Sequence, residues 1–361
     1  MMTGTSLDGI DLVYARFDSR DGEQWEFELL EAEEVPLDEK WYARLRCLDT
    51  ADARTYARTH VYWGHHLGQV LRDFIQRHGL KPQFAAAHGQ TIFHEPHRNY
   101  TAQIGDGESM VTYLDVPLVT NFRNQDVALG GQGAPLVPFG ERHLFPQRDL
   151  FLNLGGFANL SIHPESGKPL AFDVAAANLA FNWLARTLDP PLPYDPDGQI
   201  AAQGTLQPDW LAELDALDFY AEAPPKSLGT EWFEAAVLPL LVREDISVAD
   251  KLHTYGVHLA GQVARALRAH RGQGGAMVVT GGGARNKFLR KELIKALKPS
   301  GIVLAEVDNA VIDFKEALIF AFLGLHTLLG RPNVLGSVTG AAYDNLGGSI
   351  HLPPRGHQPY L

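Results

Sequence analysis

The sequence is poor in cysteine, in long apolar runs and in basic residues relative to acidic ones. Its one cysteine, Cys47, excludes an intramolecular disulfide and is typical of a reducing cytoplasm. Acidic residues outnumber basic ones by 43 to 31, a formal charge of −12, which argues against a nucleic-acid or anionic-membrane surface. The longest apolar stretch, residues 317–329, contains His326 and is shorter than the about 20 residues that span a bilayer. We therefore expect a cytoplasmic protein that binds neither nucleic acid nor membrane.

The chain begins with MMTGTSLDGIDLVYARF (1–17), a turn-forming Gly/Thr/Ser/Asp cluster directly in front of an apolar strand. No basic and then apolar run follows Met1, so we expect no signal peptide. Turn clusters normally join two elements, yet only the element after this one is visible in the sequence.

Strand-like and helical patterns alternate along the 361 residues, which favours an α/β architecture with two domains. The glycine- and proline-rich crossing at 128–138 predicts a boundary, which gives a first lobe over 1–127 and a second over 128–361, with the extreme C-terminus packing back on the first. The predicted strands cover 10–17, 25–30, 84–87, 118–120 and 302–307, and the predicted helices cover 54–78, 109–113 and 313–330. Strand–turn–strand, strand–helix and strand–loop–helix patterns occupy 149–163, 171–185 and 276–297.

Three glycine-rich turns follow or precede strands, at Gly4–Gly9, Gly155–Gly156 and Gly281–Gly283. Glycine allows backbone N–H groups to approach phosphate oxygens closely. None of the three is a Walker loop or a GxGxxG fingerprint, and each alone is explained by ordinary turn chemistry. Together they favour a nucleotide, with hydroxyls from Thr5 and Ser6 near its phosphates and Asp8 and Asp11 holding Mg²⁺ through water.

Polar residues in apolar surroundings mark further candidate positions. Asp173 follows a strand pattern, where α/β sheets bind ligands, although capping of a helix that begins near Val174 explains it equally well. Glu316 lies within an apolar helix and needs a partner, either a salt bridge or a substrate hydroxyl. His88, Gln90 and Thr91 form a polar cluster suited to sugar hydroxyls or to a structural role.

The chain resembles, over essentially its whole length, the anhydro-N-acetylmuramic acid kinase family of the sugar kinase/Hsp70/actin superfamily. The resemblance rests on ten motifs that occur in the family's order: TGTSLDGID (3–11), HGQT (88–91), QIGD (103–106), NFRNQDVALGGQGAPLVP (121–138), NLGGFANLS (153–161), YDPDGQIAAQG (194–204), PPKSLGTEWF (224–233), TGGGARN (280–286), DFKEAL (313–318) and SVTGA (337–341).

The resemblance implies a two-lobed, actin-like ATPase fold with ribonuclease-H-like lobes and the active site in the cleft between them. It implies an enzyme of cell-wall recycling that opens the 1,6-anhydro bond of its amino sugar with water and phosphorylates the freed O6 from ATP. The family also suggests a homodimer and the use of Mg²⁺. The expected product is N-acetylmuramic acid 6-phosphate.

The matching motifs assign roles to individual residues. Asp173 corresponds to the catalytic aspartate, a general base for water. The sugar or its lactyl group is assigned to His88, Gln90, Arg123, Asn178 and Glu316; the guanidinium of Arg123 suits the lactyl carboxylate. The nucleotide is assigned to Gly4, Thr5, Ser6, Leu7, Asp8, Gly9, Ile10, Asp11, Gly155, Gly156, Gly281, Gly282 and Gly283.

Two positions depart from the family pattern. Family members have a strand ahead of the first glycine turn, and we expect it to be central in the first lobe's sheet, so the recorded start is interpreted as truncated. After Asp173 the chain reads Val-Ala-Ala-Ala-Asn, where the family has a proline-containing turn. The alanines Ala175–Ala177 favour an earlier helix start, which would shift Asp173.

Two alternatives to the kinase stay open at this point. The chain could be a catalytically impaired relative that binds nucleotide or anhydrosugar as a sensor, which the short start and the alanines favour. It could also be a glycosidase that uses Asp173 and Glu316 as a carboxylate pair, a reading that leaves the glycine turns without a role.

Overall fold

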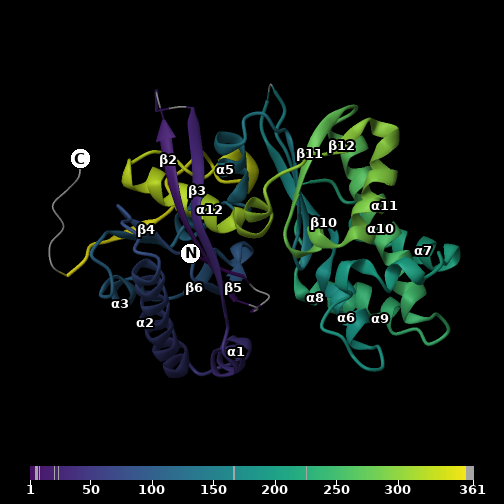
Figure 1. Cartoon of the computed structure of the whole chain (residues 1–361), viewed down its shortest axis with the longest axis horizontal. Coiled ribbons are helices and arrows are strands. Elements are labelled where there is room, and N and C mark those ends of the chain that lie inside the picture. Colours follow the sequence, from purple (N-terminus) through teal and green to yellow (C-terminus); the bar gives the residue numbers. More distant parts are fainter. Residues whose placement is uncertain are drawn as a thin grey trace. The chain divides into compact units, whose positions relative to one another are not determined.

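The structure, a computed structural model, describes residues 1–354 apart from Thr5, Ser6, Asp8, Arg20, Glu23, Ser166 and Pro225. The chain forms two compact units, coloured along the sequence in Figure 1: unit 1 is Met1–Phe145 with Phe314–Leu361, and unit 2 is Pro146–Asp313. The first division thus lies after residue 145, not after residue 127. Helix α5 (Val137–Leu144) accounts for the difference, because its Phe139 and Leu144 are buried in the core of unit 1.

Two sets of three strands, joined by backbone hydrogen bonds of Met1, form the main sheet of unit 1. β1 (Met2–Thr3), β2 (Gly9–Ser19) and β3 (Trp25–Pro36) pair antiparallel, and β2 and β3 contain the strands predicted at 10–17 and 25–30. β4 (Ala85–Ala86), β7 (Leu118–Thr120) and β13 (Ser349–His351) form a second set. Backbone hydrogen bonds between Met1 and both Ala86 and His88 place β1 beside β4. β1 therefore lies between β2 and β4. This is the central place in which we expected the strand ahead of the first glycine turn, and β1 has two residues.

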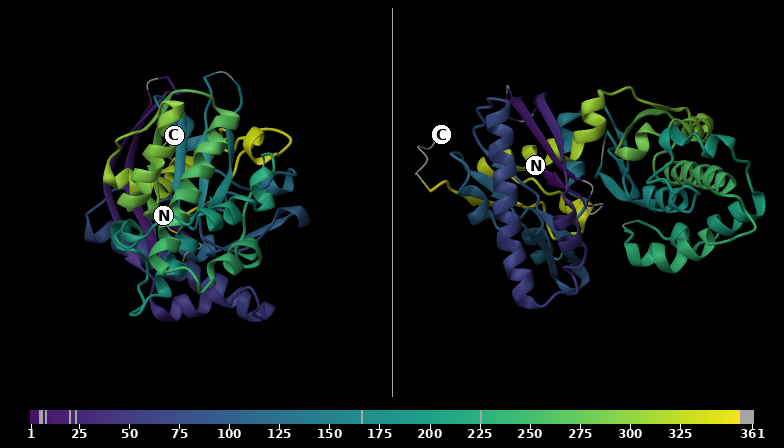
Figure 2. Two further views of the ribbon diagram at one scale, coloured as in Figure 1. Left: turned by 90° about the vertical axis from the view of Figure 1, so that its right-hand side faces the viewer. Right: turned by 60° about the horizontal axis from the view of Figure 1, so that its bottom comes forward.

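Alternation along these strands sends neighbouring side chains to opposite faces. Ile10 and Leu12 pack with helix α2 (Ala53–Arg77), whereas Val13 packs with the helices on the other face, α5 and α12 (Asn309–Leu328). In β4, Ala85 likewise packs on the α2 side and Ala86 on the side of α5 and α12. Unit 1 is therefore a sheet covered by helices on both sides, and the right-hand view of Figure 2 shows α2 as its long continuous helix.

The remaining elements of unit 1 are short. They are α1 (Glu39–Arg46), β5 (Gln90–Glu95), β6 (Tyr100–Ile104), α3 (Gly107–Val111), α4 (Asn124–Ala128) and α13 (Gly336–Thr339). α2 begins after Asp52, whose carboxylate accepts from the N–H groups of Arg54 and Thr55, and it ends before Gly79, which has a φ of +60°. This long helix agrees with the prediction over 54–78.

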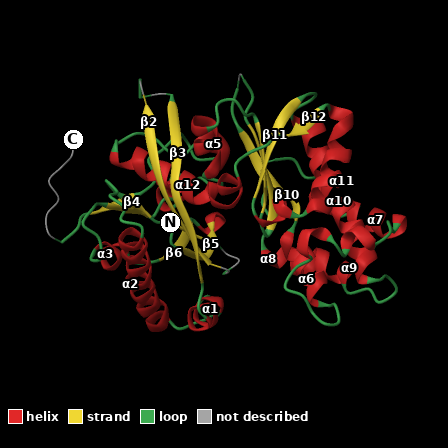
Figure 3. Ribbon diagram, viewed as in Figure 1, coloured by secondary structure: helices red, strands yellow, loops and turns green. Residues whose placement is uncertain are grey.

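Unit 2 contains one five-stranded sheet, drawn yellow in Figure 3, in the order β10-β9-β8-β11-β12. Its strands are β8 (Leu150–Leu154), β9 (Phe157–Ile162), β10 (Leu170–Ala176), β11 (Gly275–Thr280) and β12 (Ile302–Leu304). β9 is antiparallel to its neighbours, and β8, β11 and β12 are parallel. Numbered along the chain the order is 3-2-1-4-5, as expected for a ribonuclease-H-like lobe.

The helices of unit 2 cover a single apolar cluster that includes Leu152, Leu160 and Met277 of the sheet. The helices are α6 (Asn178–Arg186), α7 (Pro208–Asp215), α8 (Thr230–Trp232), α9 (Leu238–Leu241), α10 (Val248–His270) and α11 (Lys287–Leu297). Tyr255 of α10 is fully buried and donates its hydroxyl to the Ala176 carbonyl oxygen, which ties the helix to β10. The α/β class expected from the sequence is confirmed.

Among the helices that the structure describes, none is both long enough and apolar enough to cross a membrane.

Candidate functional site

Four polar residues lie in one row across the sheet of unit 2. Asp173 of β10 is paired with Asn159 of β9, Asn159 with Asn153 of β8, and Asn153 with Thr280 of β11. Directly paired residues project from the same face of a sheet. The Asn159 amide donates to the Asp173 carboxylate, and the Thr280 hydroxyl donates to Asn153 Oδ1 at 3.2 Å. The row lies at the carboxyl ends of β8 and β11, directly before their glycine turns.

Two hydrogen-bond donors fix the direction of the Asp173 carboxylate in β10. Its Oδ2 accepts from the backbone N–H of Leu228 at 2.7 Å, and its Oδ1 accepts from Asn159. Burial raises the pKa of Asp173 to about 6, and these two donors oppose that rise because they favour the charged form. A β-bulge lies between Asp173 and Ala175, a feature that re-aims side chains near functional sites.

The structure overturns two sequence-based readings of this segment. Asp173 does not cap a helix, because α6 begins at Asn178 and its N-cap residue is Ala177. Nor do the alanines start the helix early: Ala175 and Ala176 continue β10 and are fully buried. Alanine's helix propensity is outweighed here by pairing with β9 and by burial in the core.

The turn Gly155–Gly156 joins β8 to β9 and is fastened to the start of α6. The backbone N–H groups of Ala177 and Asn178 donate to the Gly156 and Gly155 carbonyl oxygens at 2.8 and 3.0 Å. The side-chain amide of Asn178 donates to the Leu154 carbonyl oxygen at 2.9 Å. Asn178, assigned to the sugar, is thus placed beside the second glycine turn.

The loop Gly281–Gly283 follows β11 and lies against the same turn. Gly281 has a φ of +81°, and a Cβ on it would lie 2.8 Å from Asn153 Oδ1 and 2.9 Å from the Leu154 backbone. A Cβ on Gly283 would lie 2.8 Å from Leu154 Cβ and 3.0 Å from Asn178 Oδ1. The two glycine turns and Asn178 therefore form one cradle of backbone at the carboxyl ends of parallel strands, where α/β sheets bind ligands.

We expect Gly281→Ala to lower the free energy of unfolding by about 3 kcal/mol, because alanine is strained at positive φ and its methyl group would overlap the Leu154 backbone. Gly282→Ala is the matched control, since a Cβ there meets only Asn178 Nδ2 at 3.5 Å. Thermal denaturation of both variants checks this, and equal melting temperatures would contradict the close packing of the cradle.

In unit 1 the first glycine turn is described in part. Thr5, Ser6 and Asp8 lie outside the described residues. Gly4 accepts at its carbonyl oxygen from Leu7 N–H at 3.3 Å and from Gln90 Nε2 at 3.2 Å.

The second half of this turn runs into β2. Gly9 opens the strand, Ile10 has a fully buried side chain, and Asp11 pairs with Met2. Ile10 therefore belongs to the core beneath the turn, and no part of it is exposed.

His88, Arg123 and Glu316 form a second polar group in unit 1. Arg123 donates through Nε to His88 Nε2 at 2.8 Å and through Nη1 to the Gly133 carbonyl oxygen at 2.7 Å. His88 Nδ1 lies 2.8 Å from the Gly89 carbonyl oxygen, so its proton is on Nδ1 and Nε2 accepts from arginine. Burial, then Arg123, holds the pKa of His88 well below its usual value, so the ring is neutral.

The electrostatics of this group depend on burial. Burial lowers the pKa of Arg123 to about 10, against the opposing effect of Glu316 and Asp126. Burial also raises the pKa of Glu316, which the positive charges of Lys315 and Arg123 counteract. A neutral histidine bonded to an arginine, with a carboxyl group that interacts electrostatically with the same arginine, suits hydroxyl groups and one carboxylate of a ligand.

Several residues in these groups were not predicted from the sequence. Asn153 and Asn159 lie in the NLGGFANLS motif, where their alternation with apolar residues was the available signal. Asp126 is fully buried and accepts at Oδ2 from Gly133 N–H at 2.7 Å and at Oδ1 from the Thr339 hydroxyl and the Asn345 amide, both at 2.8 Å. It fixes the loop that holds Arg123, a role that only the fold reveals.

The described residues contain no group of three or more histidine, cysteine, aspartate or glutamate side chains able to hold a metal ion. Mg²⁺ keeps several water ligands and often takes only one or two protein carboxylates beside the phosphates of a nucleotide. Asp11 fits that smaller requirement, and the other residue assigned to the metal, Asp8, is outside the described part of the chain.

Unit 2 has the features of an α/β protein that binds a phosphate-bearing ligand: two glycine turns and a carboxylate at one end of its sheet. The model of one protein family, described as anhydro-N-acetylmuramic acid kinase, matches residues 1–353. The chain belongs to the anhydro-N-acetylmuramic acid kinase family.

Individual relatives agree with this assignment. An anhydro-N-acetylmuramic acid kinase of Pseudomonas putida is 36% identical over 95% of this chain and 98% of its own length. One of Nitrosospira multiformis is 33% identical over 97% of each chain. Among solved structures, the activator of the 2-hydroxyisocaproyl-CoA dehydratase from Clostridium difficile with bound ADPNP covers 90% of this chain and 99% of its own, at 13% identity and a TM-score of 0.41. A likeness this distant indicates neither a shared ligand nor a shared activity.

Proposed function

We propose that this protein is an ATP-dependent kinase that opens 1,6-anhydro-N-acetylmuramic acid with water and phosphorylates the freed O6. The observation that carries the proposal is Asp173, a carboxylate fixed by two donors in the same sheet that ends in two glycine turns. The family to which the chain belongs supports the choice of sugar.

In the proposed reaction Asp173 accepts a proton from a water molecule, whose oxygen bonds to C1 of the sugar. The C1–O6 bond breaks, and its electron pair stays on O6. O6 then bonds to the γ-phosphorus of ATP as the bond to the β,γ-bridging oxygen breaks, which yields ADP. The proton on Asp173 is released to solvent. A base with a pKa near the working pH is suited to this step.

The other assigned residues bind and orient the two substrates. We assign the phosphates of ATP to the turns at 4–11 and 155–156, and its adenosine to the neighbourhood of 281–283. Mg²⁺, when bound with ATP, would neutralise phosphate charge, and Asp11 with Asp8 would hold it through water.

The sugar contacts are assigned to the polar groups described above. Arg123 suits the lactyl carboxylate, because its guanidinium forms a planar fork of donors. Glu316, His88, Gln90 and Asn178 suit the hydroxyl and acetamido groups. We further propose a cytoplasmic location and a homodimer, both as implied by the family.

The test is release of ADP from MgATP by the purified protein, with and without 1,6-anhydro-N-acetylmuramic acid. The expected result is ADP release that depends on the sugar. Nucleotide binding without release would favour the catalytically impaired relative, although Ala175 and Ala176 lie in β10 and not in an early helix, which removes one reason for that alternative. Sugar opening without ATP consumption would indicate a glycosidase.

The rate should depend on pH through Asp173. The base must be ionised to accept a proton, and its pKa is raised to about 6. We therefore expect kcat to be level above pH 6 and to fall as the pH drops below it, approaching tenfold per pH unit. A steady-state profile between pH 5 and 8 measures this, and a rate independent of pH over that range would contradict the assignment of the base.

A further inference from the structure

The outer edge of β10 is covered by a segment from the PPKSLGTEWF motif. β10 is an edge strand of its sheet, so its backbone on that side needs partners. The Asp173 N–H donates to the Lys226 carbonyl oxygen at 3.1 Å, and the Leu228 N–H donates to Asp173 Oδ2 at 2.7 Å. Residues 226–228 thus hold both the backbone and the carboxylate of Asp173.

This support matters because β10 is irregular at this point. The bulge between Asp173 and Ala175 interrupts the ladder with β9 directly after the aspartate. On the β9 side the carboxylate has one donor, the side chain of Asn159. The second donor, Leu228 N–H, belongs to the covering segment, so the direction of the carboxylate depends on where that segment lies.

Lys226 anchors the covering segment through its side chain. Its ammonium donates to the Phe219 carbonyl oxygen at 2.8 Å and lies 4.3 Å from the centre of the Phe219 ring. Phe219 is buried and packs against Trp232 at a ring distance of 5.2 Å. The lysine therefore ties residues 226–228 to a rigid aromatic group.

That aromatic group is in turn fixed to helix α10. The Tyr220 hydroxyl lies 3.0 Å from Nε2 of buried His258, whose Nδ1 lies 2.6 Å from Asp215 Oδ1. Since Asp215 accepts from Nδ1, Nε2 accepts from the tyrosine hydroxyl. The chain of contacts from α10 through residues 219–220 to Lys226 ends at Asp173.

We propose that Lys226 is a positioning residue for the base: its ammonium, held by Phe219, keeps the Leu228 N–H directed at the carboxylate of Asp173. The inference rests on the proposed function, in which Asp173 accepts the proton of water. Lys226 acts through the backbone of its own segment and touches no reacting atom.

The first test is Lys226→Met, which keeps a long apolar side chain and removes the ammonium. We expect kcat for sugar-dependent ADP release to fall about 10- to 100-fold, while KM for ATP and for the sugar change less than about twofold. Lys226→Arg should restore most of kcat, because a guanidinium can also donate to the Phe219 carbonyl oxygen and lie over its ring.

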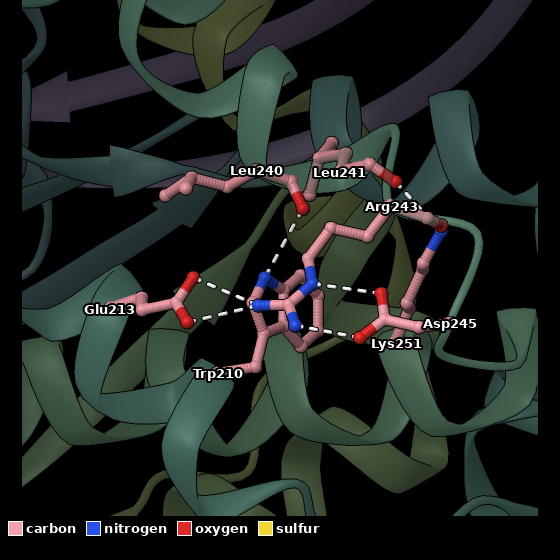
Figure 4. A network of polar contacts seen from close by, with 7 residues as sticks. All are labelled: Trp210, Glu213, Leu240, Leu241, Arg243, Asp245 and Lys251. Carbon is pink, nitrogen blue, oxygen red and sulfur yellow. Dashed lines mark hydrogen bonds and ion pairs between the residues drawn. The ribbon is translucent and has the colours of Figure 1, made fainter.

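Lys251→Met is the matched control. Figure 4 shows Lys251 of α10 directed at the carbonyl oxygens of Leu241 and Arg243, the first at 2.9 Å. Lys251 is, like Lys226, a lysine that donates to backbone carbonyl groups, and burial lowers the pKa of both. We expect Lys251→Met to lower the melting temperature and leave kcat within twofold of the parent. Equal losses of kcat in the two methionine variants, or no rescue by arginine, would overturn the inference.

A second measurement does not depend on activity. Burial, the Leu228 N–H and the Asn159 amide set the pKa of Asp173, and loss of the Leu228 donor removes stabilisation of the charged form. We expect the NMR titration of the Asp173 carboxyl carbon, assigned by comparison with Asp173→Asn, to move to higher pH in Lys226→Met and not in Lys251→Met. If the parent releases no ADP, the proposed function fails and this titration decides alone: an unchanged midpoint would overturn the positioning role.

Discussion

Asp173→Asn is expected to lower kcat for sugar-dependent ADP release by about 10³-fold, because it removes the general base. Asparagine keeps the size of the side chain and an oxygen that can accept from Leu228 N–H or Asn159. It cannot take a proton from water. ADP release measured at saturating ATP and sugar checks the prediction.

Folding and nucleotide binding serve as the controls for this variant. The pKa of Asp173 is raised to about 6 in the folded protein, above its usual value of about 4, so this group costs stability as the pH rises from about 4 to 6, and the full cost remains at higher pH. Asp173→Asn removes that cost, so its melting temperature at pH 8 should equal or exceed that of the parent. ATP affinity should be unchanged. A variant that keeps the parent's rate would show that another group is the base.

Lys315→Met is expected to lower the free energy of unfolding by about 3–5 kcal/mol, because it breaks a buried ion pair. Lys315 Nζ lies 2.6 Å from Glu141 Oε1, and both side chains are about 2% exposed. The pair joins α12 to α5 within unit 1. Without the lysine, the buried carboxylate of Glu141 loses the ion pair with Lys315. Denaturant unfolding, read by circular dichroism, measures the loss.

The double variant Lys315→Met/Glu141→Leu separates the ion pair from packing. Replacing both members of a buried pair by apolar residues is often neutral or stabilising, whereas removing one partner is costly. We therefore expect the double variant to recover more than half of the stability lost in Lys315→Met. If the double variant is as unstable as the single one, the loss comes from disturbed packing and not from removal of the Lys315 charge.

The elements of this chain could be predicted well wherever local pattern and tertiary pairing agree. The helix over 54–78 has a regular apolar face, an aspartate cap and a glycine stop, and the structure forms α2 with these features. The strands predicted at 10–17 and 25–30 likewise form β2 and β3, which pair with each other.

The prediction was wrong where tertiary context outweighs propensity. Ala175–Ala177 were expected to start a helix, but burial and pairing with β9 keep Ala175 and Ala176 in a strand. Contacts between residues far apart in the sequence also could not be predicted. The contact of Asn153 with Thr280 joins positions 127 residues apart, and that of Leu228 with Asp173 joins positions 55 residues apart. No periodicity within a window of sequence contains that information.

The sequence predicted which residues form the candidate site, but not the partners that surround them. Motif matches located His88, Arg123 and Glu316, and the structure brings these three together in unit 1. The tautomer of His88 and the buried Asp126 beneath Arg123 depend on partners that only folding supplies.

The central claim is tested most directly by the mass of the sugar product and its ratio to ADP. The protein is incubated with MgATP and 1,6-anhydro-N-acetylmuramic acid, and the product is analysed by mass spectrometry together with the amount of ADP. The account predicts a product heavier than the substrate by one water and one phosphoryl group, with one ADP formed per product molecule. A product that gains water alone, or ADP formed without any change in the sugar, would contradict it.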